Sequence, residues 1–216
     1  MFARALLDAL LAFLFPDRCA GCRRAGALLC ASCRAELRPY PGGLRNQPAS
    51  LTEVRIVYLF NGPLRAVVHQ LKYRRQQRMA QPLADLLAAD LTARPLPFEA
   101  ILAVPLHRDR LAERGFNQAE VIAAHVARAV GSTLVSEGLV RVRATGQQAR
   151  LDARARAENV RGAFAWTADA PPPRRALLID DVLTTGATMG ACAEALRAAG
   201  TAEVYGLALA RSRPDY

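Results

Sequence analysis

The stretch of sequence that decides the fold runs from Ala176 to Thr188, A-L-L-I-D-D-V-L-T-T-G-A-T. It opens with four apolar residues of the kind that form a strand buried on both faces of a parallel sheet. Two carboxylates follow, then a hydroxyl-rich turn around Gly186, and then a helix that we expect to span Thr188 to Ala199. Open α/β sheets bind ligands at the carboxyl ends of their strands, so the functional chemistry is expected at this turn.

The turn itself has the residues of a phosphate-binding loop. Gly186 lets the backbone approach a ligand closely, and N–H groups of residues 185–188 can converge on an anion at the start of the helix. Asp180 and Asp181 would repel the same phosphate, so we expect them to face neutral hydroxyls or a divalent cation. A sugar phosphate with a free diol meets both demands. The structural alternative is a threonine-capped helix beside two solvated acids.

These thirteen residues resemble the motif with which type I phosphoribosyltransferases bind 5-phosphoribosyl-1-pyrophosphate (PRPP). The resemblance implies the fold of that family, an α/β fold with a central parallel sheet flanked by helices. It also implies that the two acids hold the ribose 2′ and 3′ hydroxyls, with Mg²⁺, and that the turn holds the 5′-phosphate. On this basis we expect the substitution Asp181→Asn to abolish PRPP binding and to leave stability unchanged or slightly raised. The implied PRPP-binding residues are Asp180, Asp181, Val182, Leu183, Thr184, Thr185, Gly186, Ala187 and Thr188.

Two C-x-x-C pairs lie near the N-terminus, Cys19 with Cys22 and Cys30 with Cys33. Two thiolates from each pair can reach one tetrahedral ion, and four protein ligands leave no open position for catalysis. The spacing therefore predicts a structural Zn²⁺ site. Two disulfides and a thioredoxin-like redox pair are the alternatives, and no strand of a βαβ unit precedes Cys19 to favour the redox pair.

The N-terminal segment predicts a small module ahead of the main domain. Phe2 to Phe15 is expected to form an amphipathic helix, because Asp8 interrupts its apolar run and it is too short to span a membrane. Reduced thiols free to bind metal then indicate the cytoplasm. The stretch from Pro39 to Pro48 is typical of a linker. We therefore expect a zinc module with its linker over residues 1–48 and a phosphoribosyltransferase domain over residues 49–216.

The chain has a formal net charge of +10, and Lys72 is its only lysine. A basic surface attracts nucleic acid through phosphate contacts and counterion release, which favours single-stranded DNA as a partner. Part of the arginine excess can also be compositional bias.

Strand and helix patterns alternate along the rest of the chain, which predicts a parallel-sheet α/β domain. Asn117 is expected to cap a helix that reaches Val130, with Glu120 completing a capping box. The expected strands are Val54 to Phe60, Ala100 to Val104, Leu139 to Val142, one near Ala176 and Glu203 to Ala210. The other expected helices are Pro63 to Leu71 and Pro82 to Leu91.

Three further segments make the resemblance more specific: L-K-Y at residues 71–73, V-P-L-H at 104–107 followed by R-G-F-N-Q at 114–118, and residues 143–164. Together with the cysteine pairs and the acid pair, they resemble the ComF family of competence-associated, phosphoribosyltransferase-like proteins over almost the whole chain. The resemblance implies a link to natural transformation, with single-stranded DNA and a helicase or another uptake protein as partners. The catalytic residues that it implies are Lys72, Arg114, Asp180 and Asp181.

The loop after Val104 leaves a strand end near the phosphate turn. Its backbone N–H groups and arginines can meet a pyrophosphate, which carries too much charge for one arginine to neutralise. Arg114 is the first candidate among these arginines, and a solvated basic face is the structural alternative. The predicted pyrophosphate-binding residues are Pro105, Leu106, His107, Arg108 and Arg114.

The segment from Arg143 to Arg161 is polar and rich in arginine and glutamine, which suits a lid that closes over a reaction centre and excludes water. A solvated helix with salt bridges is the alternative. The predicted lid residues are Thr145, Gln148, Arg156 and Asn159.

The implied reaction is displacement of pyrophosphate from C1 of PRPP, helped by Mg²⁺ and by cations around the leaving group. The sequence shows no site for an acceptor. This leaves open a second hypothesis, in which a non-catalytic DNA-binding or adaptor protein uses the PRPP site to sense a ligand.

Overall fold

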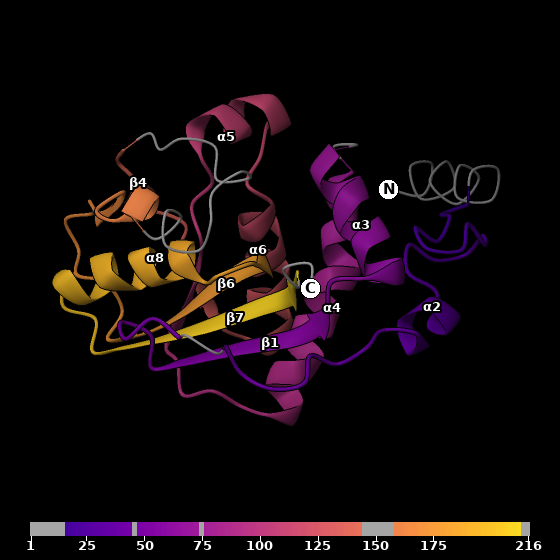
Figure 1. The fold of residues 1–216 in the computed structure, drawn as a ribbon, viewed down its shortest axis with the longest axis horizontal. Coiled ribbons are helices and arrows are strands. Elements are labelled where there is room, and N and C mark those ends of the chain that lie inside the picture. The colour runs from indigo at the N-terminus through magenta and orange to yellow at the C-terminus, as the bar shows by residue number, and fades with distance from the viewer. Residues whose placement is uncertain (1–15, 45–46, 74–75, 144–157, 213–216) are drawn as a thin grey trace, which may run out of the picture.

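A five-stranded parallel sheet lies at the centre of the fold (Figure 1). The computed structural model describes residues 16–44, 47–73, 76–143 and 158–212. The order of the strands across the sheet is β1-β7-β6-β2-β3. They span Glu53–Leu59 (β1), Ala100–Ala103 (β2), Thr133–Leu134 (β3), Arg175–Leu183 (β6) and Glu203–Arg211 (β7).

Strand β6 is buried on both faces, as its apolar run predicts. Leu177 and Ile179 pack into a core with helices α3, α4 and α6, whereas Ala176 and Leu178 pack into a second core with α8. Figure 1 shows α8 on one side of the sheet and α6 on the other. The helices span Gly62–Tyr73 (α3), Ala80–Ala93 (α4), Gln118–Val130 (α6) and Ala187–Ala198 (α8).

The long elements match the sequence prediction to within about two residues at each end. Helix α6 begins where expected, since the Asn117 side chain accepts a hydrogen bond from the Ala119 N–H at 3.1 Å. It ends at Gly131, whose φ of 68° lies in the left-handed region that glycine tolerates best. The capping residues Asn117 and Gly131 therefore set the two ends of this helix.

The strand predicted near Leu139 does not join the parallel sheet. It forms β4 (Leu139–Arg141), which pairs antiparallel with β5 (Phe164–Trp166) in a separate two-stranded sheet. Only a few residues separate β3 from β4, too few for the crossover that a parallel pairing needs. Sequence patterns also missed the short elements α2 (Ala31–Ala35), η1 (Gln77–Met79), α5 (Arg108–Arg114), β3 and β5.

The N-terminal cysteine segment shares a core with the sheet. Cys19, Leu29 and Cys33 are buried in the same apolar cluster as Leu64 and Leu71 of α3. The division of the chain at residue 48 stays a prediction, and the predicted helix over residues 2–15 lies outside the described residues. Within the described part of the chain, no helix has the length and apolar character needed to cross a membrane.

Candidate functional site

The acid pair lies at the carboxyl end of β6, in the middle of the sheet. Strand β2 runs beside β6, with Ala103 paired to Ile179, so the segment after β2 starts next to the acids as expected. Asp180 is half-buried, and its Oδ1 accepts a hydrogen bond from the Asp181 N–H at 2.8 Å. Asp181 is only 2% exposed.

A closed network of side chains surrounds Asp181. Lys72, near the end of α3, forms an ion pair with Asp181 Oδ2. Gln118, the first residue of α6, donates from Nε2 to Asp181 Oδ1 at 3.1 Å and accepts a hydrogen bond from Arg114. Arg114 in turn donates from Nε to the Lys72 carbonyl oxygen at 3.1 Å. Three of the four predicted catalytic residues therefore belong to one network.

The two acids differ in their electrostatics. Burial and the negative charge of Asp181 raise the pKa of Asp180 to about 8, although Lys72 opposes the shift. Burial also tends to raise the pKa of Asp181, but the Lys72 charge and the hydrogen bonds from Lys72 and Gln118 outweigh it and lower that pKa. Asp181 is therefore the ionised member of the pair and Asp180 the one that holds a proton near neutral pH.

This arrangement corrects the expectation that both acids face neutral hydroxyls or a cation. Asp181 faces Lys72 and Gln118 in the interior, where removing its charge would leave Lys72 without its counterion. We therefore no longer expect Asp181→Asn to be neutral for stability. Asp180 is the more accessible carboxylate of the pair.

The turn after β6 has the conformation expected of an anion-binding loop. Gly186 has a φ of 82° and stands at the N-cap of α8 without a side-chain cap hydrogen bond. No acidic residue lies in the first turn of α8, so this helix end is electropositive. A Cβ atom on Gly186 would lie 2.5 Å from Leu44 Cδ2, so the linker packs directly against the turn.

The predicted pyrophosphate-binding residues fall into two groups. Pro105, Leu106 and Arg108 line a pocket of about 260 Å³, whereas Arg114 belongs to the network around Asp181. His107 caps α5, and its Nδ1 accepts a hydrogen bond from the Asp109 N–H at 3.2 Å. Sequence patterns predicted a loop here, but the His107 cap and Gly115 at the far end define a short helix, α5.

The predicted lid connects β4 to β5. Thr145, Gln148 and Arg156 lie outside the described residues. Asn159 is described, and its carbonyl oxygen accepts a hydrogen bond from Arg143 Nη2 at 3.2 Å. The role of this segment as a lid stays a prediction.

The four cysteines form a cluster that fits a metal ion. The sulfur atoms of Cys19, Cys22, Cys30 and Cys33 all lie within 4.8 Å of one another. A tetrahedral site with Zn–S bonds of about 2.3 Å has edges of about 3.8 Å, and the sulfurs of Cys22 and Cys30 are 3.6 Å apart. All four are free thiols, so the disulfide alternative is not formed.

Local backbone structure brings the cysteine pairs together. The first pair lies in a turn that the Arg23 N–H closes on the Cys19 carbonyl oxygen at 2.9 Å. Cys30 is the N-cap of α2, which places Cys33 in its first turn. A Cβ atom on Gly21 would lie 2.8 Å from Cys33 Sγ, so the turn requires glycine there.

Backbone N–H groups also favour a thiolate in this cluster. Burial raises the pKa of the Cys19 thiol, but hydrogen bonds from the N–H groups of Cys30, Cys22 and Gly21 outweigh it and lower the pKa to about 6. Burial and the neighbouring thiols raise the pKa of Cys33. Metal ligation needs thiolates, and these backbone hydrogen bonds favour the thiolate form of Cys19.

Two residues of the site were not among the predicted site residues, although both lie in segments that carry the family resemblance. Gln118 joins Asp181 to Arg114, and in the sequence it ends the R-G-F-N-Q segment at the first position of a capped helix. Tyr73 is 60% exposed, and the Arg114 guanidinium lies over its ring at 5.9 Å from the centroid. Lys72, Tyr73 and Arg114 line a small pocket together with Glu113.

The chain thus has a parallel α/β fold with an acid pair and an anion-binding turn at the centre of the sheet, beside a cysteine cluster. It is 31% identical over 207 residues to "Competence protein F" of Haemophilus influenzae, which covers 90% of each chain. It is also 36% identical over 159 residues to "DNA utilization protein YhgH" of Salmonella typhi, 71% of this chain and 69% of the relative. The chain belongs to the family of these two proteins, the ComF family.

No family model matches the chain. Solved structures similar to it are phosphoribosyltransferases. A hypoxanthine phosphoribosyltransferase from Staphylococcus aureus is 14% identical with a TM-score of 0.38, and the match covers 65% of this chain and 69% of that one. An orotate phosphoribosyltransferase from Aeropyrum pernix is 19% identical with a TM-score of 0.38, and the match covers 68% of this chain and 63% of that one. A likeness of this degree does not extend to substrate or activity.

Proposed function

We propose that this ComF-family protein binds PRPP with Mg²⁺ at the carboxyl end of β6 and acts in the handling of DNA. The observation that carries the proposal is the asymmetric acid pair. Asp181 is buried in an ion pair, whereas Asp180 offers a half-buried carboxyl group beside the turn of residues 184–188. A ribose diol on Asp180 and a 5′-phosphate on the turn would use the two halves of the site at once.

The surrounding cations suit the departure of pyrophosphate. Arg114 and Lys72 are fixed next to the acids by the Asp181 network. In phosphoribosyl transfer the bond between C1 and the pyrophosphate oxygen breaks, a nucleophile forms a new bond to C1, and its proton leaves. Fixed positive charge near the leaving group stabilises that charge separation. Mg²⁺ would supply further positive charge on the pyrophosphate.

Calorimetric titration with Mg²⁺ and PRPP tests the binding step. We expect the wild-type protein to bind and Asp180→Asn to lose at least tenfold in affinity. Asp169→Asn is the matched control, because it removes one exposed carboxylate from the segment that precedes β6, whereas Asp180 lies near the carboxyl end of that strand. Undiminished affinity in Asp180→Asn would overturn the assignment of this site.

Release of pyrophosphate from PRPP in the presence of candidate acceptors tests the transfer step separately. Release that depends on an acceptor supports an enzyme, whereas tight PRPP binding without release supports a ligand sensor. We further propose that the protein works in the cytoplasm, where the cysteine thiols stay reduced. We also propose that the chain divides after residue 48 into a zinc module and a phosphoribosyltransferase domain, and that its macromolecular partner is single-stranded DNA.

A further inference from the structure

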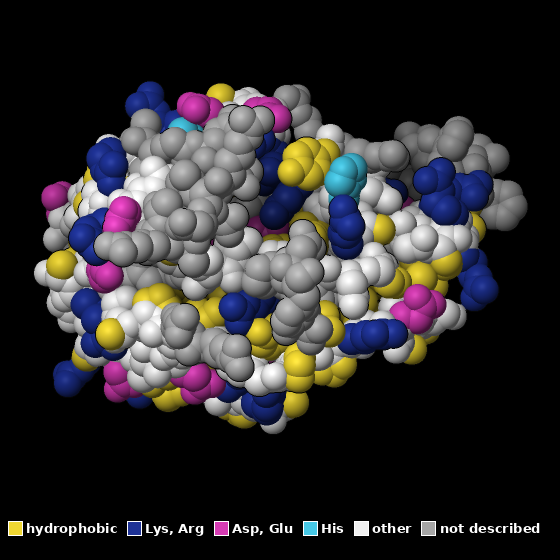
Figure 2. All heavy atoms as spheres, in the orientation of Figure 1, with side chains coloured by type: hydrophobic (Ala, Val, Ile, Leu, Met, Phe, Trp, Pro, Cys, Tyr) yellow, Lys and Arg dark blue, Asp and Glu magenta, His cyan; other side chains and the backbone are white. Residues whose placement is uncertain are grey.

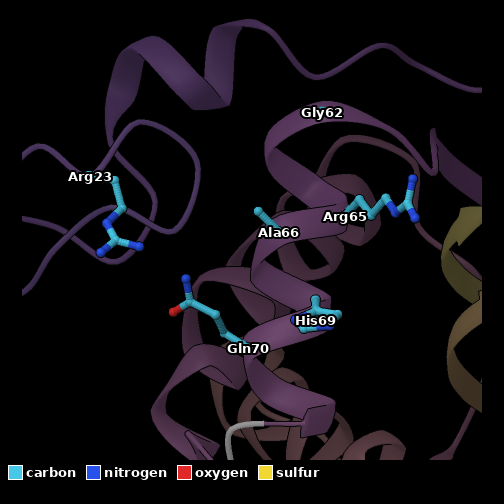
Figure 3. Close-up of a pocket in the computed structure, with 6 residues that line it drawn as sticks. All are labelled: Arg23, Gly62, Arg65, Ala66, His69 and Gln70. Carbon is cyan, nitrogen blue, oxygen red and sulfur yellow. The ribbon is translucent and has the colours of Figure 1, made fainter.

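A pocket of about 300 Å³ lies between the cysteine turn and α3, away from the acid pair (Figure 3). In Figure 3, Arg23 lies on the turn beside α3, Gln70 extends from α3 toward Arg23, and Arg65 extends from the other side of α3. Arg65 and His69 complete its polar lining. A second pocket of about 230 Å³ adjoins the first, with which it shares Arg23 and Gln70, and the two together are here called the α3 groove.

The α3 groove is lined by cations and neutral groups. Its charged lining residues are Arg23 and Arg65 in the first pocket, with Arg18 and Arg78 added in the second. Arg78 forms an ion pair with Asp17, so Arg18, Arg23 and Arg65 are the arginines that the groove offers to a phosphate. No carboxylate is among the residues that line either pocket in the described part of the chain. Guanidinium groups in such a setting bind phosphate oxygens through paired N–H donors.

An aromatic surface continues the groove along α3. The His69 ring lines the first pocket and lies 4.9 Å from the Tyr73 ring, centroid to centroid. Tyr73 is 60% exposed, although a ring of this size normally avoids water. An exposed ring beside a basic groove is the arrangement on which unpaired bases stack.

From this combination we infer that the α3 groove binds the backbone of single-stranded DNA, with a base stacked on Tyr73. The arginines hold phosphates, and the ring pair holds a base that a duplex would keep inside its own stack. Because Tyr73 also lines the pocket with Lys72 and Arg114, the strand would lead toward the acid pair. The inference rests on the DNA-related role proposed above, but it involves neither acid.

Binding of a fluorescent thymidine oligomer, measured by anisotropy over a range of salt concentrations, tests the inference. The double variant Arg23→Gln/Arg65→Gln should bind at least tenfold more weakly. Each lost phosphate contact lowers the slope of log K against log salt by about 0.7 for single strands, so the slope should fall by about 1.4. The double control Arg128→Gln/Arg174→Gln removes the same two charges from exposed positions outside the groove and should change neither quantity.

Tyr73→Leu should lower the affinity about tenfold without changing the salt slope, whereas Tyr73→Phe should bind as the wild type does. Zinc content and circular dichroism of each variant check that the cysteine turn is intact. Normal DNA binding by the folded double variant would overturn the inference and would leave the arginines as counterions of the thiolates. Equal binding of duplex DNA, or displacement by thymidine monophosphate at the same phosphate concentration, would also overturn it.

Titration of the double variant Arg23→Gln/Arg65→Gln with Mg²⁺ and PRPP separates this inference from the proposed function. A double variant that loses DNA and keeps PRPP supports the α3 groove as a separate site. If instead Asp180→Asn no longer bound PRPP and the double variant still bound DNA, the assignment of DNA binding to the α3 groove would be refuted, and the PRPP site at the acid pair would be supported. The surface in Figure 2 shows the setting, with dark-blue basic side chains spread over this face of the molecule.

Discussion

Lys72 forms an ion pair with Asp181, which joins the end of α3 to the carboxyl end of β6. The Lys72 side chain is 20% exposed and that of Asp181 only 3%. The pair thus lies at the inner wall of the site. It links the L-K-Y segment to the acid pair, two segments that lie far apart in the sequence, and it gives Asp181 a role in stability as well as in the site.

Lys72→Met should destabilise the protein by about 3 kcal/mol, because it leaves the buried Asp181 carboxylate without its counterion. The double variant Lys72→Met/Asp181→Asn should recover most of that loss, since replacing both members of a buried pair is often nearly neutral. Urea unfolding followed by circular dichroism gives the free energies. Losses that simply add in the double variant would show that the ion pair does not couple the two residues.

Asp180 should make the stability depend on pH in a defined direction. Its pKa rises from 3.8 in the unfolded chain to about 8 in the fold, so the folded protein binds the extra proton between these values. Its contribution to stability is therefore full below about pH 4 and is lost as the pH rises through 8. Asparagine does not titrate, so the variant Asp180→Asn should not lose stability in this way as the pH rises.

The measurement is the stability of Asp180→Asn relative to the wild type at pH 5, 7 and 9. We expect the free energy of unfolding of the variant to rise relative to that of the wild type from pH 5 to pH 8, and the difference to level off above pH 8. Asp181 works in the opposite sense, because its lowered pKa adds stability above pH 4 that is lost in acid. A difference that stays constant from pH 5 to 9 would contradict the shifted pKa of Asp180.

The sequence predicted the centre of the fold well because local patterns determine it. An apolar run that precedes two acids and a glycine turn placed β6, the acid pair and α8, and the Asn117 cap placed α6. Contacts between distant segments were beyond such patterns. The Lys72 ion pair, the Gln118 bridge and the position of Leu44 on Gly186 depend on how α3, α6 and the linker pack on the sheet, and the two-residue strand β3 is too short to have a period.

Gly186→Ala should cost about 2–4 kcal/mol, from left-handed strain and from contact with the linker. Gly186 has a φ of 82°, and a new Cβ would lie 2.5 Å from Leu44 Cδ2. Gly115→Ala is the matched control, since Gly115 has nearly the same φ, 83°, but no atom lies within 4 Å of the new Cβ. We expect the control to cost only about 1–2 kcal/mol.

Thermal or urea unfolding of the two glycine variants measures this difference. Gly186→Ala/Leu44→Ala should regain the part of the loss that comes from the contact, after allowance for the Leu44→Ala change alone. If Gly186→Ala and Gly115→Ala lost equal stability, the close packing of the linker on the phosphate turn would be refuted.

The cysteine cluster should hold about one zinc ion per chain in protein purified under reducing conditions without chelator. Cys22→Ser should lose the metal and unfold more easily, because one ligand of four is gone and Cys19, Cys30 and Cys33 cannot close the tetrahedron. Gly21→Ala should weaken zinc binding without removing a ligand, since its methyl group would lie 2.8 Å from Cys33 Sγ. Cys192→Ala, which removes a buried thiol of α8 outside the cluster, should keep the full zinc content. Elemental analysis of the four proteins decides the matter, and wild-type protein without zinc would rule out the structural site.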